Sequence, residues 1–175
     1  DLRNDVCLNL LVLSVDPDNS PEITAMIGAS IALSISDIPW NGPIAGVFMG
    51  LVDGELVVNP TAAQRAKSDL ELTVAGSEKK VVMIEAGAKE VPEDTMFDAI
   101  MKAHEEIKKV VAFINTIVAE IGKPKFSYPS CEVDHDMFDA IEEYAIEKVR
   151  AALDTDDKNV RDERLKVVYD DVFTH

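Results

Sequence analysis

The sequence predicts an α+β fold, with a sheet-and-helix part followed by a small all-helical part. Up to about residue 88, short apolar runs of strand length alternate with turn residues, which is typical of a sheet. From Glu93 onward, apolar residues recur at steps of three and four, which is typical of amphipathic helices. The 175 residues are 47% hydrophobic and 29% charged, so the composition excludes a disordered or fibrous chain and fits one or two compact units.

The first elements are a strand and a helix. Residues 6–15 form a near-continuous apolar run, which predicts a strand buried on both faces. Turn residues 16–19 end this run, and Ser20, Pro21 and Glu22 are typical of a helix start. The helix is expected to extend to about Ser36 and to be buried on several sides, because it is apolar all round and has small residues at 28–30 and 32 for close packing.

Two hairpins follow the helix. The runs 45–52 and 56–58 flank Asp53-Gly54, a dipeptide that strongly favours a tight hairpin turn. The runs 70–75 and 81–86 flank a second turn at residues 76–79. Four short strands in succession indicate an antiparallel or mixed sheet.

The C-terminal half is expected to be helical. A long amphipathic helix is predicted over 93–121, ending at Gly122 with Pro124 just beyond. Residues 123–133 are predicted to be a linker, and two further helices are predicted over 134–153 and 157–173. Two helices are too few to bury their own apolar stripes, so we expect them to pack on each other and on something else.

Charge and cysteine usage restrict the function. The net charge is −16 and is spread along the chain, which argues against a broad surface that binds a polyanion. Cys7 and Cys131 have no metal-binding spacing and indicate no disulfide framework, so a reducing, cytoplasmic setting is expected. The longest charge-free helical run, 23–35, is too short to cross a membrane, and the chain opens without a secretory leader. No membrane association is expected.

Three motifs that suggest metal binding or catalysis are incomplete. Asp16-x-Asp18-x-Ser20 resembles the opening of a calcium loop, but Pro21 and Ile27 stand where that loop needs glycine and a carboxylate. His104-Glu105-Glu106 begins a zinc-protease pattern, but Lys108 stands where the second histidine is needed. Ser30, in Gly28-Ala29-Ser30, lies in the middle of a helix rather than on the turn that a nucleophile requires.

The remaining charged candidates also have simpler interpretations. The acidic pairs at 105–106 and 142–143 consist of adjacent helical residues that point about 100° apart, so neither is a carboxylate dyad. Lys79-Lys80 is expected to be a solvated turn, whereas Arg65 and Lys67 are slightly better candidates for a phosphate contact. The residues alone therefore predict no catalytic, phosphate-binding or metal-binding residue, and they assign no RNA-binding residue.

A set of ordered motifs closely resembles bacterial polynucleotide phosphorylase. These motifs lie at residues 25–34, 38–44, 59–61, 70–76 and 82–88, and the resemblance extends over about 5–122. The resemblance implies that residues 1–122 are the C-terminal part of the first of two RNase PH-type domains, with 123–133 as a linker. Residues 134–175 resemble, more loosely, the start of the family's all-helical linker domain.

The resemblance implies a phosphate-dependent 3′-to-5′ exoribonuclease that degrades RNA to nucleoside diphosphates and can also run in reverse as an RNA polymerase. Such enzymes are cytoplasmic homotrimers that act with further proteins of RNA degradation, and magnesium assists phosphoryl transfer in the full-length enzyme.

This segment departs from the family's catalytic copy at two places. Where that copy has a phosphate-binding serine run, residues 18–22 read Asp-Asn-Ser-Pro-Glu, and carboxylates repel phosphate. Where it has a catalytic aspartate, this chain has Asn59-Pro60-Thr61. We therefore expect a non-catalytic scaffold and oligomerisation portion that does not bind Mg²⁺, with RNA and inorganic phosphate bound by other parts.

Two alternatives remain open. One is a stand-alone binding or assembly module without enzymatic activity, in which the helical segment docks a partner. The other is a shorter stand-alone RNase PH relative, which would need an upstream half-domain and catalytic acids.

Overall fold

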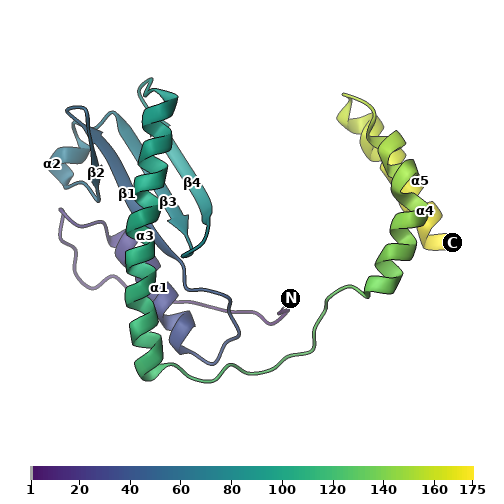
Figure 1. Cartoon of the computed structure of the whole chain (residues 1–175), viewed down its shortest axis with the longest axis horizontal. Helices are drawn as coiled ribbons and strands as arrows, with labels where there is room; N and C mark the ends of the chain where they lie inside the picture. Colours follow the sequence, from purple (N-terminus) through teal and green to yellow (C-terminus); the bar gives the residue numbers. More distant parts are fainter. Residues whose placement is uncertain (1) are drawn as a thin grey trace. The chain divides into compact units, whose positions relative to one another are not determined.

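The computed structural model describes residues 2–175, which fold as two units (Figure 1). The sheet unit contains residues 4–128, and the helical unit contains residues 129–175 together with Leu2 and Arg3. The elements in chain order are α1 (Pro21–Ile35), β1 (Ala45–Val52), β2 (Glu55–Val58), α2 (Ala62–Arg65), β3 (Leu70–Gly76), β4 (Val81–Ala88), α3 (Glu93–Ile121), α4 (His135–Leu153) and α5 (Lys158–Thr174).

The four strands form one antiparallel sheet in the order β2-β1-β3-β4, so both predicted hairpins are confirmed. Asp53 and Gly54 have φ angles of 52° and 83°, the left-handed conformation that a two-residue hairpin turn requires at both positions. The long central pairing joins β1 to β3, from Ala45 opposite Gly76 to Gly50 opposite Glu71. The α+β class predicted from the sequence is therefore confirmed.

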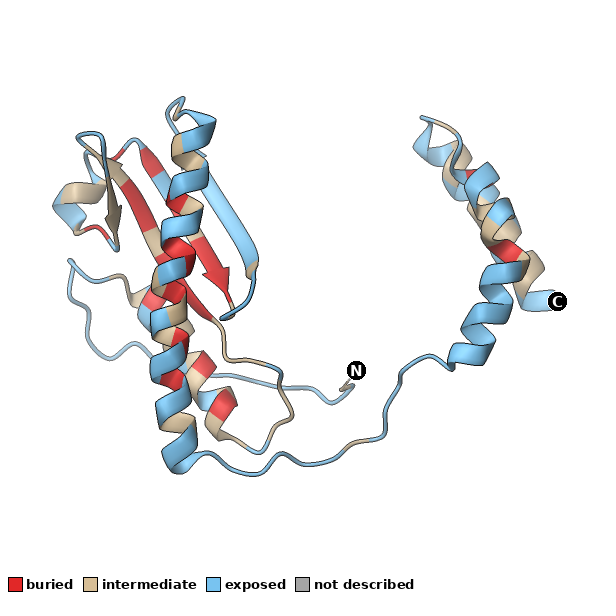
Figure 2. Ribbon diagram, in the orientation of Figure 1, coloured by how far each residue is buried: buried red, intermediate tan, exposed pale blue. Residues whose placement is uncertain are grey.

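The core lies between the sheet and α3. Alternate residues of β1 and β3 are buried against α3, as strand geometry requires when one face is covered (Figure 2). On α3 the buried positions recur at helical spacing, so one stripe of the helix faces the sheet. The buried cluster consists of Ala45, Val47, Met49, Leu70, Leu72, Val74, Ala99, Ala103, Ile107 and Val111.

Helix α1 begins as predicted but is less buried than expected. The Ser20 hydroxyl accepts the Ile23 N–H, and Pro21 occupies the first turn. The helix packs on β1 and α3, and the ideal Cβ position of Gly46 lies only 2.3 Å from the Met26 sulfur. Gly28, however, is exposed and has nothing within 4 Å of its ideal Cβ position. The expectation of burial on several sides is wrong, because the contacts with β1 and α3 leave part of this apolar helix uncovered.

The predicted strand at residues 6–15 is wrong. In the part of the chain that the structure describes, this segment is irregular and exposed, with Leu11 83% and Leu13 87% accessible. A buried strand needs hydrogen-bonding neighbours and cover on both faces. Among residues 2–175 the four strands of the sheet pair only with one another, so the apolar run has no strand beside it and no cover on both faces.

A one-turn helix, α2, was not expected from the sequence. The Thr61 hydroxyl accepts the Gln64 N–H, and the Gln64 side chain accepts the Thr61 N–H, which together form a capping box. The Thr-x-x-Gln signal is visible in the sequence, but a single turn has no apolar period by which it could be recognised.

The long helix ends at Gly122 as predicted. Gly122 has an ordinary φ of −65°, so it is not needed for a left-handed cap. Its ideal Cβ position lies 2.4 Å from the Val118 carbonyl oxygen, and the glycine therefore allows a close backbone approach. Residues 122–134 have no regular structure, and the division into domains at 123–133 stays a prediction.

The helical unit consists of α4 and α5, which pack against each other as predicted. Asp134 and Asp157 cap the two helices with their side chains. Lys148 Nζ lies 2.6 Å from Asp171 Oδ2 and joins the helices. Phe138 and Ile141 of the predicted stripes are exposed, and most of the remaining stripe residues are only half-buried, so packing on something else stays a prediction. Among residues 2–175, no helix combines the length and the apolar composition needed to cross a membrane.

Candidate functional site

The turn before α1 is closed by Asp16. Its carboxylate accepts the Asp18 N–H at 3.0 Å and the Asn19 side-chain amide at 2.6 Å. These two hydrogen bonds, chiefly the one from Asp18, hold the pKa of Asp16 below its ordinary value of 3.8. The turn with an N-cap that the sequence favoured over a calcium loop is confirmed.

The N-terminal end of α1 already carries an anion, the Glu22 side chain. The Ser20 hydroxyl donates to Glu22 Oε2 at 2.6 Å. This bond, together with the backbone N–H of Glu22 and more weakly the charge of Arg65, lowers the pKa of Glu22 from 4.5. A helix N-terminus attracts anions, and here the chain supplies one itself.

Arg65 joins α2 to this turn. Its guanidinium donates through Nη1 to the Pro60 carbonyl at 2.8 Å and through Nη2 to the Pro17 carbonyl at 3.0 Å. Nearby, Asp18 Oδ1 accepts the Ala62 N–H at 3.3 Å. Arg65, a candidate phosphate contact, is therefore engaged with two backbone carbonyls, whereas Lys67 lies exposed beyond α2.

These segments enclose a cleft of about 580 Å³ on the sheet face opposite α3. Phe48 and Thr73 are paired across β1 and β3 and line the cleft from the sheet. Met26 lines it from α1, while Glu22 and Arg65 supply opposite charges at its edge. The cleft is thus largely apolar, and Arg65, the one cation among the described residues that line it, has a carboxylate beside it.

Asn59 ends the first hairpin rather than facing the cleft. Its side-chain Oδ1 accepts the Phe48 N–H at 2.9 Å, and its own N–H donates to the Phe48 carbonyl at 2.7 Å. Its φ of 47° turns the chain away from the sheet, a conformation that asparagine tolerates. The side-chain oxygen thus substitutes for the backbone carbonyl that would otherwise continue the ladder.

The oxygen donors near this cleft do not fit a magnesium site. Mg²⁺ needs carboxylate oxygens that are free to enter octahedral coordination. Here the oxygens of Asp16 and Asn59, and Oδ1 of Asp18, accept hydrogen bonds from the chain itself. Within residues 2–175, no group of three or more His, Cys, Asp or Glu side chains could hold a metal ion.

The other residues that the sequence analysis considered for metal binding, catalysis or phosphate contact have structural or surface roles. His104 is buried, and its Nε2 lies 3.0 Å from the Ser77 carbonyl, which ties α3 to the turn between β3 and β4. The hydroxyl of Ser30 is buried in mid-helix and accepts the Ile44 N–H at 3.1 Å. Lys79 lies exposed in a turn, as expected.

The acidic pairs are likewise surface features. Glu105 pairs with Lys108 and Glu106 with Lys109, each at 2.7 Å. Each adjacent glutamate thus has its own lysine one turn along the helix, which agrees with the expectation that the two carboxylates do not act together. Residues 142–143 lie exposed on α4.

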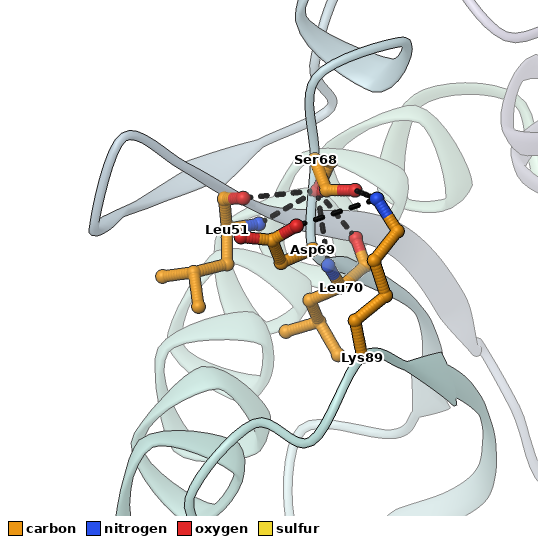
Figure 3. A network of polar contacts seen from close by, with 5 residues as sticks. All are labelled: Leu51, Ser68, Asp69, Leu70 and Lys89. Carbon is orange, nitrogen blue, oxygen red and sulfur yellow. Dashed lines mark hydrogen bonds and ion pairs between the residues drawn. The ribbon is translucent and has the colours of Figure 1, made fainter.

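Sequence reasoning missed a buried serine at the start of β3. Ser68 Oγ accepts the Leu51 N–H at 2.9 Å and the Leu70 N–H at 3.2 Å, and its hydroxyl donates to the Leu70 carbonyl at 2.6 Å (Figure 3). Lys89 Nζ reaches the Ser68 carbonyl and Asp69, both at 3.3 Å. Ser68 joins the end of β1 to the start of β3, and no local sequence pattern marks this long-range role.

Comparisons with known proteins identify the fold and the relatives. Residues 42–106 match the family described as "3' exoribonuclease family, domain 2". The rice (Oryza sativa) Rrp46 crystal structure is similar with a TM-score of 0.53 and 16% identity, covering 60% of this chain and 51% of that chain. This likeness concerns the fold alone, and with the family match it confirms the RNase PH-type fold.

Similarity in sequence extends over nearly the whole chain. The polyribonucleotide nucleotidyltransferase of Ruminiclostridium cellulolyticum is 58% identical over 94% of this chain, and that of Lachnoclostridium phytofermentans is 58% identical over 96%. The protein of the same name from Clostridioides difficile is 49% identical over 99% of this chain. The chain spans only 24–25% of the length of these relatives. Residues 42–106 therefore resemble domain 2 of the 3′ exoribonuclease family, and the resemblance of the chain to bacterial polynucleotide phosphorylase is confirmed.

Proposed function

We propose that this chain is a non-catalytic scaffold and oligomerisation portion of a polyribonucleotide nucleotidyltransferase. The parent enzyme would be a phosphate-dependent 3′-to-5′ exoribonuclease that releases nucleoside diphosphates from RNA. The proposal is supported by 58% identity to proteins of that name over 94% of the chain, although the chain spans only 24% of their length.

The observation that carries the non-catalytic role is the Glu22 carboxylate at the N-terminal end of α1. It accepts the Ser20 hydroxyl there, so a phosphate in this position would have to displace it. Arg65, the cation that lines the cleft, is engaged with the Pro17 and Pro60 carbonyls. Asp16 and Asp18 add negative charge to the adjoining turn, which further disfavours an anion.

In this proposal, the binding of substrates and metal ions takes place in other parts of the longer protein. RNA, inorganic phosphate and the magnesium ions that assist phosphoryl transfer are bound outside this segment. The parent is a cytoplasmic homotrimer, and other proteins of RNA degradation are its partners. The acidic composition of this segment, with a net charge of −16, suits a role away from the RNA path.

The test is a phosphorolysis assay on the 175-residue chain with poly(A), inorganic phosphate and Mg²⁺. We expect no ADP above a protein-free control, whereas a full-length relative assayed in parallel releases ADP. A phosphate titration followed by ³¹P NMR addresses the cleft directly, and we expect no saturable binding. Phosphate-dependent ADP release, or saturable phosphate binding that Arg65→Ala abolishes, would overturn the proposal.

A further inference from the structure

The first residues after α3 are fastened to the C-terminal end of α1. We call residues 123–126 the strap. The Lys123 N–H donates to the Ile35 carbonyl at 3.0 Å, and the Phe126 N–H donates to the Asp37 carbonyl at 2.9 Å. The strap therefore lies alongside the end of α1, although nearly 90 residues of chain separate the two segments.

Lys125 supplies the central contact of the strap. Its ammonium group donates to three carbonyls, those of Leu33 at 3.1 Å, Ser34 at 2.9 Å and Ser36 at 2.5 Å. An ammonium has three N–H donors, so this arrangement uses all of them. One side chain thus serves three carbonyl groups at the end of a helix.

A cation at the end of α1 is favourable for a physical reason. The last carbonyls of a helix lack intrahelical partners and carry the negative end of the helix dipole. A cation in the last turn would stabilise these carbonyls, but α1 has no basic residue there. Lys125, which follows α3 in the sequence, provides that positive charge.

We propose that Lys125 locks the strap onto α1, so that the flexible part of the connection begins after Phe126 and not at the end of α3. The compact sheet unit includes residues up to Tyr128, although residues 122–128 have no regular structure. This division agrees with a fastened strap. The inference concerns a conformational device within this chain, and it does not depend on the proposed function.

The test is native-state hydrogen exchange of the full 175-residue chain, read at the backbone amides of Lys123 and Phe126. Lys125→Met keeps most of the length of the side chain and removes the ammonium group. We expect both amides to exchange about fivefold faster in this variant, because the strap opens more often. Lys125→Arg retains the charge and is expected to restore part of the protection.

Lys123→Met is the matched control, since it removes an identical charge two residues away while its backbone bond to Ile35 remains. It should leave the Phe126 amide unchanged. The Ile107 amide in α3 reports global unfolding and should stay protected in every variant. Equal exchange at Phe126 in Lys125→Met and in the unaltered chain would overturn the proposal, as would an equal effect of Lys123→Met.

Discussion

The packing of α3 on the sheet predicts a large difference between two substitutions on this helix. Ile107 is fully buried in the cluster formed with β1 and β3. Phe113 lies on the outer side of α3 and is 58% exposed. Ile107→Ala should therefore destabilise the sheet unit strongly, and Phe113→Ala should have little effect, although the second change removes the larger side chain.

The expected magnitude follows from burial. Truncation of a fully buried isoleucine to alanine loses the transfer free energy of its methyl groups and leaves a cavity, at a cost of about 3 kcal/mol. For a unit of this size, that cost lowers the melting temperature by about 10 °C. Phe113→Ala removes mostly exposed surface and should lower it by no more than about 3 °C.

The assay uses Trp40, the only tryptophan of the chain, which lies in the sheet unit. Its fluorescence during thermal unfolding reports the sheet unit separately from α4 and α5. Equal shifts of the melting temperature for the two variants would refute the assignment of the inner and outer faces of α3, and with it the core described above.

Three further predictions concern separate parts of the chain. Gly46→Ala places a methyl group against the Met26 sulfur and should destabilise the sheet unit by about 1–3 kcal/mol in denaturant unfolding, with partial recovery when Met26→Ala is added. Ser68→Ala leaves buried backbone groups unpaired and should cost about 1–3 kcal/mol in the same measurement. Asp171 pairs with Lys148, chiefly through a hydrogen bond that lowers the pKa of Asp171 from 3.8. The pair with Lys148 therefore stabilises the helical unit above about pH 4, and this stabilisation is lost as the pH falls through the lowered pKa of Asp171 in the folded state. Asp171→Asn should therefore reduce the pH dependence of helical circular dichroism in acid.

Local patterns predicted those elements whose determinants are close in sequence. Asp53-Gly54 contains the turn that its hairpin needs, and both residues adopt positive φ. Ser20 and Pro21 start α1 with the expected cap, and Gly122 ends α3. Each of these signals acts within four residues, so the sequence contains the whole interaction.

Apart from the one-turn helix α2, the errors and omissions concern partners that are distant in sequence. The apolar run at residues 6–15 indicates a preference for burial but does not identify what would cover it. The cleft depends on contacts between Asp18 and Ala62 and between Arg65 and Pro17, which are 44 and 48 residues apart. Lys125 lies about 90 residues from the carbonyls that it binds. No local period encodes such contacts, which tertiary packing determines.

The role of Asn59 depends on its hydrogen bond as well as on its residue type. By residue type alone, an amide is a poorer general acid and a poorer metal ligand than the aspartate of the catalytic copy. The structure adds that Oδ1 is engaged with the Phe48 N–H, a contact that a carboxylate can make equally well. Asn59→Asp should therefore unfold at nearly the same denaturant concentration as the unaltered chain, and Mg²⁺ should not raise its stability.

Asn59→Ala is the contrasting variant. It removes the acceptor for the Phe48 N–H and places alanine at a φ of 47°, so it should cost about 1–3 kcal/mol. If Asn59→Asp were stabilised by Mg²⁺ in unfolding experiments, its carboxylate would be directed at a metal site, and the ladder role assigned to Asn59 would be wrong. If Asn59→Ala unfolded like the unaltered chain, the hydrogen bond to Phe48 would not hold the end of the first hairpin. Asn59 is thus kept out of the cleft by the geometry of the hairpin, and this matters more than the absence of a negative charge on its side chain.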